Sequence, residues 1–205
     1  MGKLMLAQLK SFCFKPLPCV MLCVMSVMTF LNGQTIYFSG VCIVFMLCFS
    51  QIGPQTCPAE PYEERDYVLS RYVLYLLLVH GALLWLMVLI YLGSWVSPWQ
   101  PGLTAETLLV LAAAYMADII FISFAIPLSL STDRGMSRLV TLMLLIIICS
   151  LMLALKGLLP YLPLNLLEVC PLLPSLPWTV FLLSMVFFWR KSDEKEQPLF
   201  VRENE

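Results

Sequence analysis

Three ionisable side chains lie within or at the ends of long apolar runs, namely His80, Asp118 and Lys156. At about 1.5 Å per helical residue, His80 and Asp118 each lie roughly 20 Å from one end of their runs, near mid-membrane if the runs span a bilayer. A carboxylate in hydrocarbon is costly and usually faces a polar partner or a wet cavity. We therefore expect either a contact between Asp118 and His80, or separate satisfaction of each by Ser, Tyr or backbone groups. Lys156 is explained more simply by snorkelling to the interface.

Other patterns that carry chemistry are not found in the sequence. The chain has 8 cysteines, but Cys19 and Cys23, one helical turn apart, have no nearby His or acidic residue to complete a metal-binding set. Most of the cysteines lie in apolar runs, where they act as small hydrophobic residues. No phosphate-binding glycine motif, GxSxG, HExxH or paired carboxylates occur on a water-facing segment. We therefore expect no catalytic residues, no cofactor and no metal site.

The composition excludes soluble enzyme folds. Of 205 residues, 60% are hydrophobic and 12% are charged, and the mean hydropathy is +0.89. A soluble domain would be about half apolar with roughly a quarter of its residues charged. The net charge is −1, and the basic residues are scattered near the ends of apolar runs. This distribution indicates a lipid membrane as the surrounding medium and argues against nucleic-acid binding.

The apolar runs predict six membrane spans behind a short N-terminal segment. Residues 1–16 group apolar side chains on one helical side and lysines on the other, which predicts an amphipathic helix at the membrane interface. The alternative is a plain extension of the first span. Residues 17–189 would form the six-helix transmembrane domain. The expected spans are Leu17–Leu31, Ile36–Ile52, Tyr67–Leu92, Ala105 to about Leu130, Leu139–Leu155 and Trp178–Trp189.

The connections between these spans differ in character. A polar stretch covers residues 53–66, a loop with two interfacial tryptophans covers 93–104, and a tight polar loop covers 131–138. Five prolines interrupt residues 158–177, so that stretch predicts short broken or re-entrant helices. The tail, 190–205, is charged. The predicted fold is an all-α membrane protein with six transmembrane helices, an N-terminal interfacial helix and a broken, proline-rich outer segment before the last span.

The basic residues predict the orientation of the chain. With a cytoplasmic N-terminus, six spans place every Lys and Arg except Lys156 on the cytoplasmic side. Positive side chains concentrate on that side of membrane proteins. We therefore expect a multi-pass membrane protein with both termini in the cytoplasm.

Residues 61–73, with the sequence PYEERDYVLSRYV, lead a polar stretch into the third expected span. This segment resembles the proline-led segment of small ABC-2 type transporter permeases. The run Ile126-Pro127-Leu128, followed by Gly135 and Arg138, resembles the exit of that family's fourth span. The order of elements, from the interfacial helix to the broken stretch before span six, is also similar to that family.

The resemblance implies one half of a dimeric exporter in the bacterial cytoplasmic membrane, paired with an identical or a different permease subunit. A separate ATP-binding cassette subunit would hydrolyse ATP, and this chain would convert that hydrolysis into substrate translocation. The implied docking surface for the ATPase is the polar segment before span three. The residues assigned to this ATPase-coupling surface are Glu63, Glu64, Arg65, Asp66 and Arg71. The alternative for these side chains is a capped and solvated helix start.

Two other functions remain compatible with the sequence. An ion-coupled secondary transporter would use Asp118 and His80 and would need no ATPase, although such transporters commonly contain inverted repeats, which are not evident here. A membrane assembly or sensor protein would instead use the charged tail as a docking segment.

Overall fold

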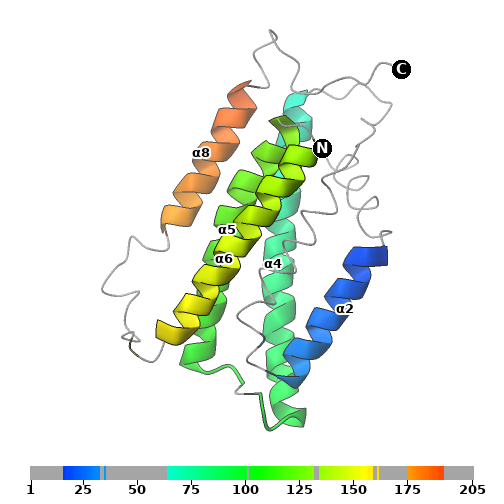
Figure 1. The fold of residues 1–205 in the computed structure, drawn as a ribbon, viewed down its shortest axis with the longest axis vertical. Coiled ribbons are helices and arrows are strands. Elements are labelled where there is room, and N and C mark those ends of the chain that lie inside the picture. The colour runs from blue at the N-terminus through cyan, green and yellow to red at the C-terminus, as the bar shows by residue number, and fades with distance from the viewer. Residues whose placement is uncertain are drawn as a thin grey trace.

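The computed structural model describes residues 16–32, 35, 64–100, 102–131, 134–158, 161 and 175–191. Most of these residues form helices, and no strand occurs among them. The helices are α2 (Pro16–Leu31), α4 (Glu64–Val96), α5 (Ala105–Ser131), α6 (Arg134–Leu158) and α8 (Ser175–Lys191) (Figure 1). The expected all-α fold is therefore confirmed for the part of the chain that the structure describes.

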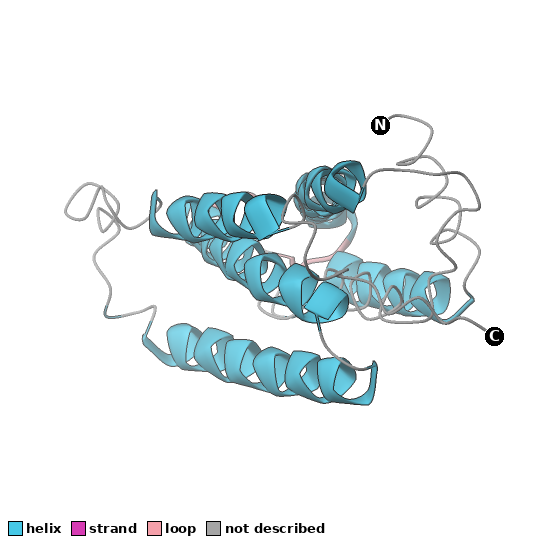
Figure 2. Ribbon diagram, turned by 90° about the horizontal axis from the view of Figure 1, so that it is seen from above, coloured by secondary structure: helices cyan, strands magenta, loops and turns pink. Residues whose placement is uncertain are grey.

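Helix α5 is the centre of the bundle. It packs against α8, α6 and α4, while α4 also contacts α8 and α2 (Figures 1 and 2). Over an apolar 18-residue stretch of each helix, 56% of the α5 stretch is buried inside the bundle but only 18% of the α6 stretch. Helix α6 therefore turns most of its apolar surface outward, as a helix in lipid or against a second subunit would do.

Three of the helices are long and apolar enough to cross a membrane, at Arg65–Val96, Ala105–Pro127 and Leu139–Leu158. They coincide with the expected third, fourth and fifth spans. The expected first and sixth spans correspond to shorter apolar helices, Leu22–Leu31 and Ser175–Arg190. The amphipathic segment 1–16 apart from Pro16, the second span, most of the proline-rich stretch and the tail beyond Lys191 lie outside the described residues. The count of six spans thus stays a prediction.

Two connections are shorter than the sequence suggested. Helix α4 continues to Val96, into the loop expected from residue 93. Helix α5 still includes Ser131, and α6 begins at Arg134, so most of the loop expected over residues 131–138 is helical. Sequence reasoning equated polar residues with a loop, but a helix satisfies its own backbone hydrogen bonds and can continue into the polar edge of a membrane.

Helix α2 is joined to α4 by polar side chains that satisfy its C-terminal carbonyl groups. The last carbonyls of a helix have no partner within the helix. Here the Gln100 amide donates to the Thr29 carbonyl at 3.0 Å, and the Ser97 hydroxyl donates to the Leu31 carbonyl at 2.9 Å. Farther along the interface between α2 and α4, the Trp85 indole N–H donates to the Ser26 hydroxyl at 2.9 Å. Hydrogen bonds, in addition to apolar burial, therefore attach α2 to the bundle.

Gly93 of α4 lies in close contact with the backbone of α2. A Cβ atom at Gly93 would lie 2.6 Å from the carbonyl oxygen of Phe30, whereas a Cβ at Gly81 of the same helix meets no atom within 4 Å. Contacts under 3.0 Å with a backbone oxygen force the two helices apart. Only glycine therefore fits at Gly93.

We expect Gly93→Ala to lower the unfolding free energy by about 1 kcal/mol, because the overpacking of roughly 1–3 kcal/mol exceeds the helix-propensity gain from alanine. Gly81→Ala is the matched control, and we expect it to be neutral or stabilising. Unfolding in mixed detergent micelles measures both. Equal effects of the two substitutions would show that α2 does not approach α4 at Gly93.

Candidate functional site

The interface of α4, α5 and α8 holds a row of polar and aromatic side chains, here called the α8 seam. In a bilayer, helices gain little from apolar burial against one another, so hydrogen bonds and close packing decide how they associate. The α8 seam supplies both. Its members are Arg65, Tyr72 and His80 of α4, Tyr115, Ser123 and Pro127 of α5, and Trp178, Phe181, Ser184 and Trp189 of α8.

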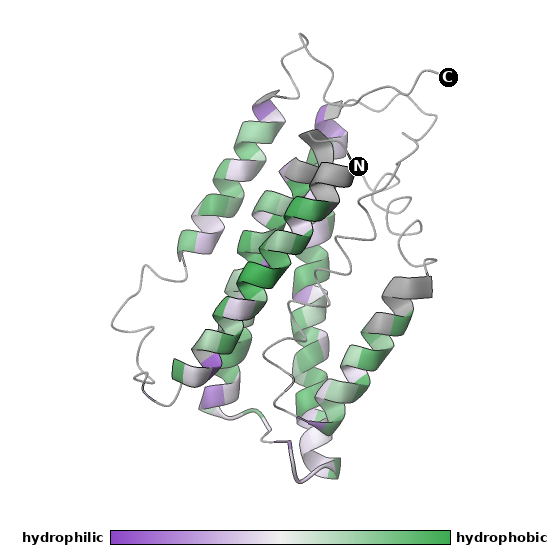
Figure 3. Ribbon diagram, in the orientation of Figure 1, coloured by the Kyte–Doolittle hydropathy of each residue, from purple (hydrophilic) through white to green (hydrophobic). Residues whose placement is uncertain are grey.

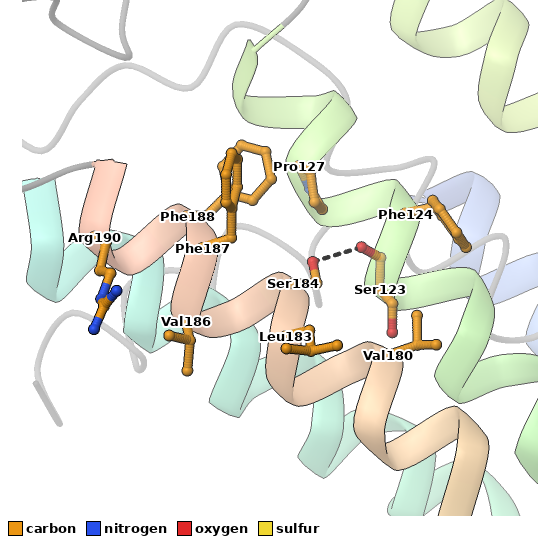
Figure 4. A pocket seen from close by; sticks show the side chains of 10 residues that line it. All are labelled: Ser123, Phe124, Pro127, Val180, Leu183, Ser184, Val186, Phe187, Phe188 and Arg190. Carbon is orange, nitrogen blue, oxygen red and sulfur yellow. Dashed lines mark hydrogen bonds between the residues drawn. The ribbon is translucent and has the colours of Figure 1, made fainter.

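Pro127 creates the polar centre of the α8 seam. A proline within a helix has no N–H to donate to the carbonyl four residues earlier, which here belongs to Ser123. The Ser184 hydroxyl of α8 donates to that carbonyl at 2.8 Å, as Figure 4 shows. Ser184 has one hydroxyl proton, so the Tyr72 hydroxyl must donate to the Ser184 oxygen, at 2.7 Å. The break in α5 is thereby repaired by α8 and α4.

Aromatic rings continue the α8 seam beside this network. The Tyr72 and Phe181 rings meet edge to face with centroids 5.5 Å apart, and Trp178 meets Phe181 in the same manner at 6.1 Å. Such pairs add roughly 0.5–1.5 kcal/mol beyond their area burial. The Tyr72–Phe181 pair therefore holds α8 against α4, and Trp178 extends the ring cluster along α8.

His80 joins this cluster and not Asp118. The Nδ1 atom of His80 lies 2.7 Å from the Leu76 carbonyl oxygen, and Nε2 lies 3.1 Å from the Tyr115 hydroxyl. A carbonyl only accepts, so Nδ1 carries a proton in this arrangement, and in the neutral ring Nε2 accepts from Tyr115. Of the two expectations for His80, the structure shows the second, in which a Tyr hydroxyl and a backbone carbonyl bond to the ring nitrogens.

Asp118 is the exception to this pattern. Its side chain is 4% exposed, and its Oδ1 atom has no hydrogen-bond partner within the described part of the chain. His80, in contrast, is exposed and already bonded through both ring nitrogens. The structure therefore does not bring the two expected intramembrane residues into a hydrogen bond, and Asp118 stands as a buried carboxyl without compensation at Oδ1.

The residues expected at the docking surface divide into different environments. The Arg65 guanidinium lies 4.0 Å from the centre of the Trp189 ring, which ties the start of α4 to the end of α8. Arg71 is buried at 4% exposure and lies over the Tyr67 ring at 5.0 Å. Asp66 is exposed. Glu63 lies outside the described residues, and of Glu64 the structure describes only the helical backbone. Within this set, Asp66 is the described side chain that offers an exposed charge.

Charged groups collect at the two ends of the bundle. Figure 3 shows hydrophilic positions at the helix ends and long apolar stretches between them. The starts of α4 and α6 and the end of α8, with Arg65, Arg134 and Arg190, form one end (Figure 1), called here the Arg65 end. The opposite end holds Trp99 and Lys156. In the described ranges, no group of three or more His, Cys, Asp or Glu side chains could hold a metal ion.

Residues 60–190 match the family described as ABC-2 family transporter protein. The chain belongs to the ABC-2 transporter family. The match covers well over half of the sequence and includes α4, α5, α6, all but the last residue of α8, and the whole α8 seam. No curated protein and no solved structure matches the chain. This ABC-2 family protein is therefore a membrane permease component of an ABC transporter, a class that works with an ATP-binding subunit.

Sequence reasoning about this ABC-2 protein missed most of the α8 seam. One signal was available, because a proline within an expected span leaves the carbonyl four residues earlier, here that of Ser123, without its helical donor. Nothing in the sequence identified Ser184 as the donor, since it lies 61 residues away on another helix. Tyr72 and Tyr115 read as ordinary span residues for the same reason.

Proposed function

We propose that this chain is the permease subunit of an ATP-driven ABC-2 exporter and works as a homodimer or heterodimer with a separate ATP-binding subunit. The observation that carries the proposal is the family match over residues 60–190. The outward-facing apolar surface of α6 supports a second subunit or lipid as its neighbour.

The orientation belongs to the same proposal. The Arg65 end faces the cytoplasm, so both termini are cytoplasmic in the bacterial membrane. The positions of Arg65, Arg134 and Arg190 at one end support this assignment, because basic residues concentrate on the cytoplasmic side. Lys156 and the exposed Trp95 and Trp99 at the opposite end suit an outer interface.

In this proposal, the ATPase docks on the segment that begins α4. Glu63, Glu64 and Asp66 supply the docking charges, and Arg65 passes movement of α4 to α8 through its contact with Trp189. Arg71 supports the segment from within, since it is buried. The network of Tyr72, Ser184 and Ser123 then links α4 to α5 and α8, so that displacement at the Arg65 end changes the packing of all three helices.

Charge reversal tests the docking surface. We expect Glu63→Lys with Glu64→Lys to reduce stimulated ATPase activity of the reconstituted transporter to near the basal rate. The two lysines would repel the partner surface that is complementary to the acidic groups. The control is Glu106→Lys, at an exposed position in the first turn of α5 and at the opposite end. Membrane insertion should be intact in both. Unchanged stimulation in the double variant would refute this docking surface.

Ion-coupled transport is a second candidate, and the burial of Asp118 with an unpartnered oxygen favours it. The source of energy separates the two candidates. Transport by the reconstituted chain that follows an ion gradient without ATP would support the ion-coupled mechanism, and dependence on the ATP-binding subunit would support the exporter.

A further inference from the structure

A groove between α5 and α8 opens sideways from the bundle near the Arg65 end. Its volume is about 540 Å³, within the roughly 300–1,000 Å³ of small-molecule sites. Phe124 and Pro127 line it from α5, and Val180 and Leu183 from α8 (Figure 4). Leu183 and Phe187 on its rim are 71% and 63% exposed, so the groove is open to whatever surrounds the helices.

The walls of the groove are apolar, and its polar atoms are already engaged. The Ser184 hydroxyl is bonded to the Ser123 carbonyl and to Tyr72, and the Ser123 hydroxyl donates to the Ile119 carbonyl at 2.6 Å. Groups that are bonded within the protein do not require polar atoms from an occupant. The interior of the groove therefore selects a hydrocarbon.

Arg190 is the one charged residue among those that line the groove, and it lies at the Arg65 end. Its side chain is exposed, and its guanidinium forms no ion pair or hydrogen bond with the described residues. From Val180 to Arg190, α8 rises by about 15 Å, which is half of a hydrocarbon core roughly 30 Å thick. An occupant that matches this site is one leaflet long, apolar along its length and anionic at one end.

We propose that the groove binds one anionic phospholipid of the adjoining leaflet, with an acyl chain between α5 and α8 and its phosphate at Arg190. Arginine suits this role because its planar fork of N–H donors matches phosphate geometry. The exposed rim gives the acyl chain a lateral entrance from the bilayer. This inference does not rest on the proposed transport function.

The test measures lipid retained by the full-length chain. The purified protein is equilibrated in vesicles of equal parts phosphatidylglycerol and phosphatidylcholine, extracted in mild detergent and analysed by native mass spectrometry. We expect the wild type to retain phosphatidylglycerol preferentially. Arg190→Gln should reduce that preference roughly fivefold, or about 1 kcal/mol, the value of one basic residue at an anionic membrane surface. Lys156→Gln, which removes a cation at the opposite end, should leave the preference unchanged.

A second variant tests the groove itself. Val186→Trp adds a large ring to the lining, and we expect it to reduce retention of both lipids while Arg190→Gln affects only the anionic one. Unfolding in micelles verifies that each variant is folded. Full preference in Arg190→Gln, or full retention in Val186→Trp, would overturn the proposal. Displacement of the lipid by inorganic phosphate alone would also overturn it. If Val186→Trp instead impaired dimer formation and left lipid retention unchanged, the groove would belong to a second copy of the chain.

Discussion

Ser184→Ala should lower the unfolding free energy of the bundle by roughly 1–3 kcal/mol, a large loss for one hydroxyl in a membrane protein. The substitution removes the donor to the Ser123 carbonyl and the acceptor for the Tyr72 hydroxyl. The Ser123 carbonyl lacks its usual donor within the helix, because Pro127 has no N–H. Reversible unfolding in mixed detergent micelles measures the change.

A matched control and a rescue make this prediction specific. Ser150→Ala on α6 removes an exposed hydroxyl that bonds only to the Ile146 carbonyl of its own helix, and we expect almost no effect. Pro127→Ala restores an N–H opposite the Ser123 carbonyl. In that background, Ser184→Ala should cost measurably less than in the wild type. Strict additivity of the two substitutions would show that the Ser184 bond does not compensate for the proline.

Asp118→Asn should raise the unfolding free energy by up to about 2–3 kcal/mol at a pH where the carboxyl is ionised, because a charged aspartate at the centre of a membrane helix costs about that much. The carboxyl is buried, and its Oδ1 has no partner within the described residues. Asparagine keeps the size of the side chain and removes the charge. The same micelle unfolding assay measures the gain.

Glu106→Gln is the control for Asp118→Asn, since Glu106 is an exposed acidic residue on the same helix, and we expect no change there. A loss of stability in Asp118→Asn would mean that the carboxylate is compensated by a group outside the described part of the chain or on a partner subunit. A gain in stability accompanied by loss of transport would identify Asp118 as a residue kept for function at the expense of stability.

The membrane class, the all-helical fold and the family followed from local properties of the sequence. Apolar runs long enough to cross a bilayer predicted the helices that became α4, α5 and α6, because in lipid a chain must satisfy its backbone groups within each span. The PYEERDYVLSRYV segment at residues 61–73 and the run at Pro127 indicated the ABC-2 family, and the family match confirms it. These properties depend on a window of about 20 residues or fewer.

Side-chain pairing was not accessible in this way. The sequence suggested that Asp118 could contact His80 because both lie at mid-depth, but depth does not specify the direction in which a side chain points from its helix. In the structure, His80 bonds to Tyr115, and Ser184 reaches Ser123 across 61 residues of sequence. A sequence fixes where each polar group lies along its own helix, whereas the rotation and neighbours of the packed helices decide which groups meet.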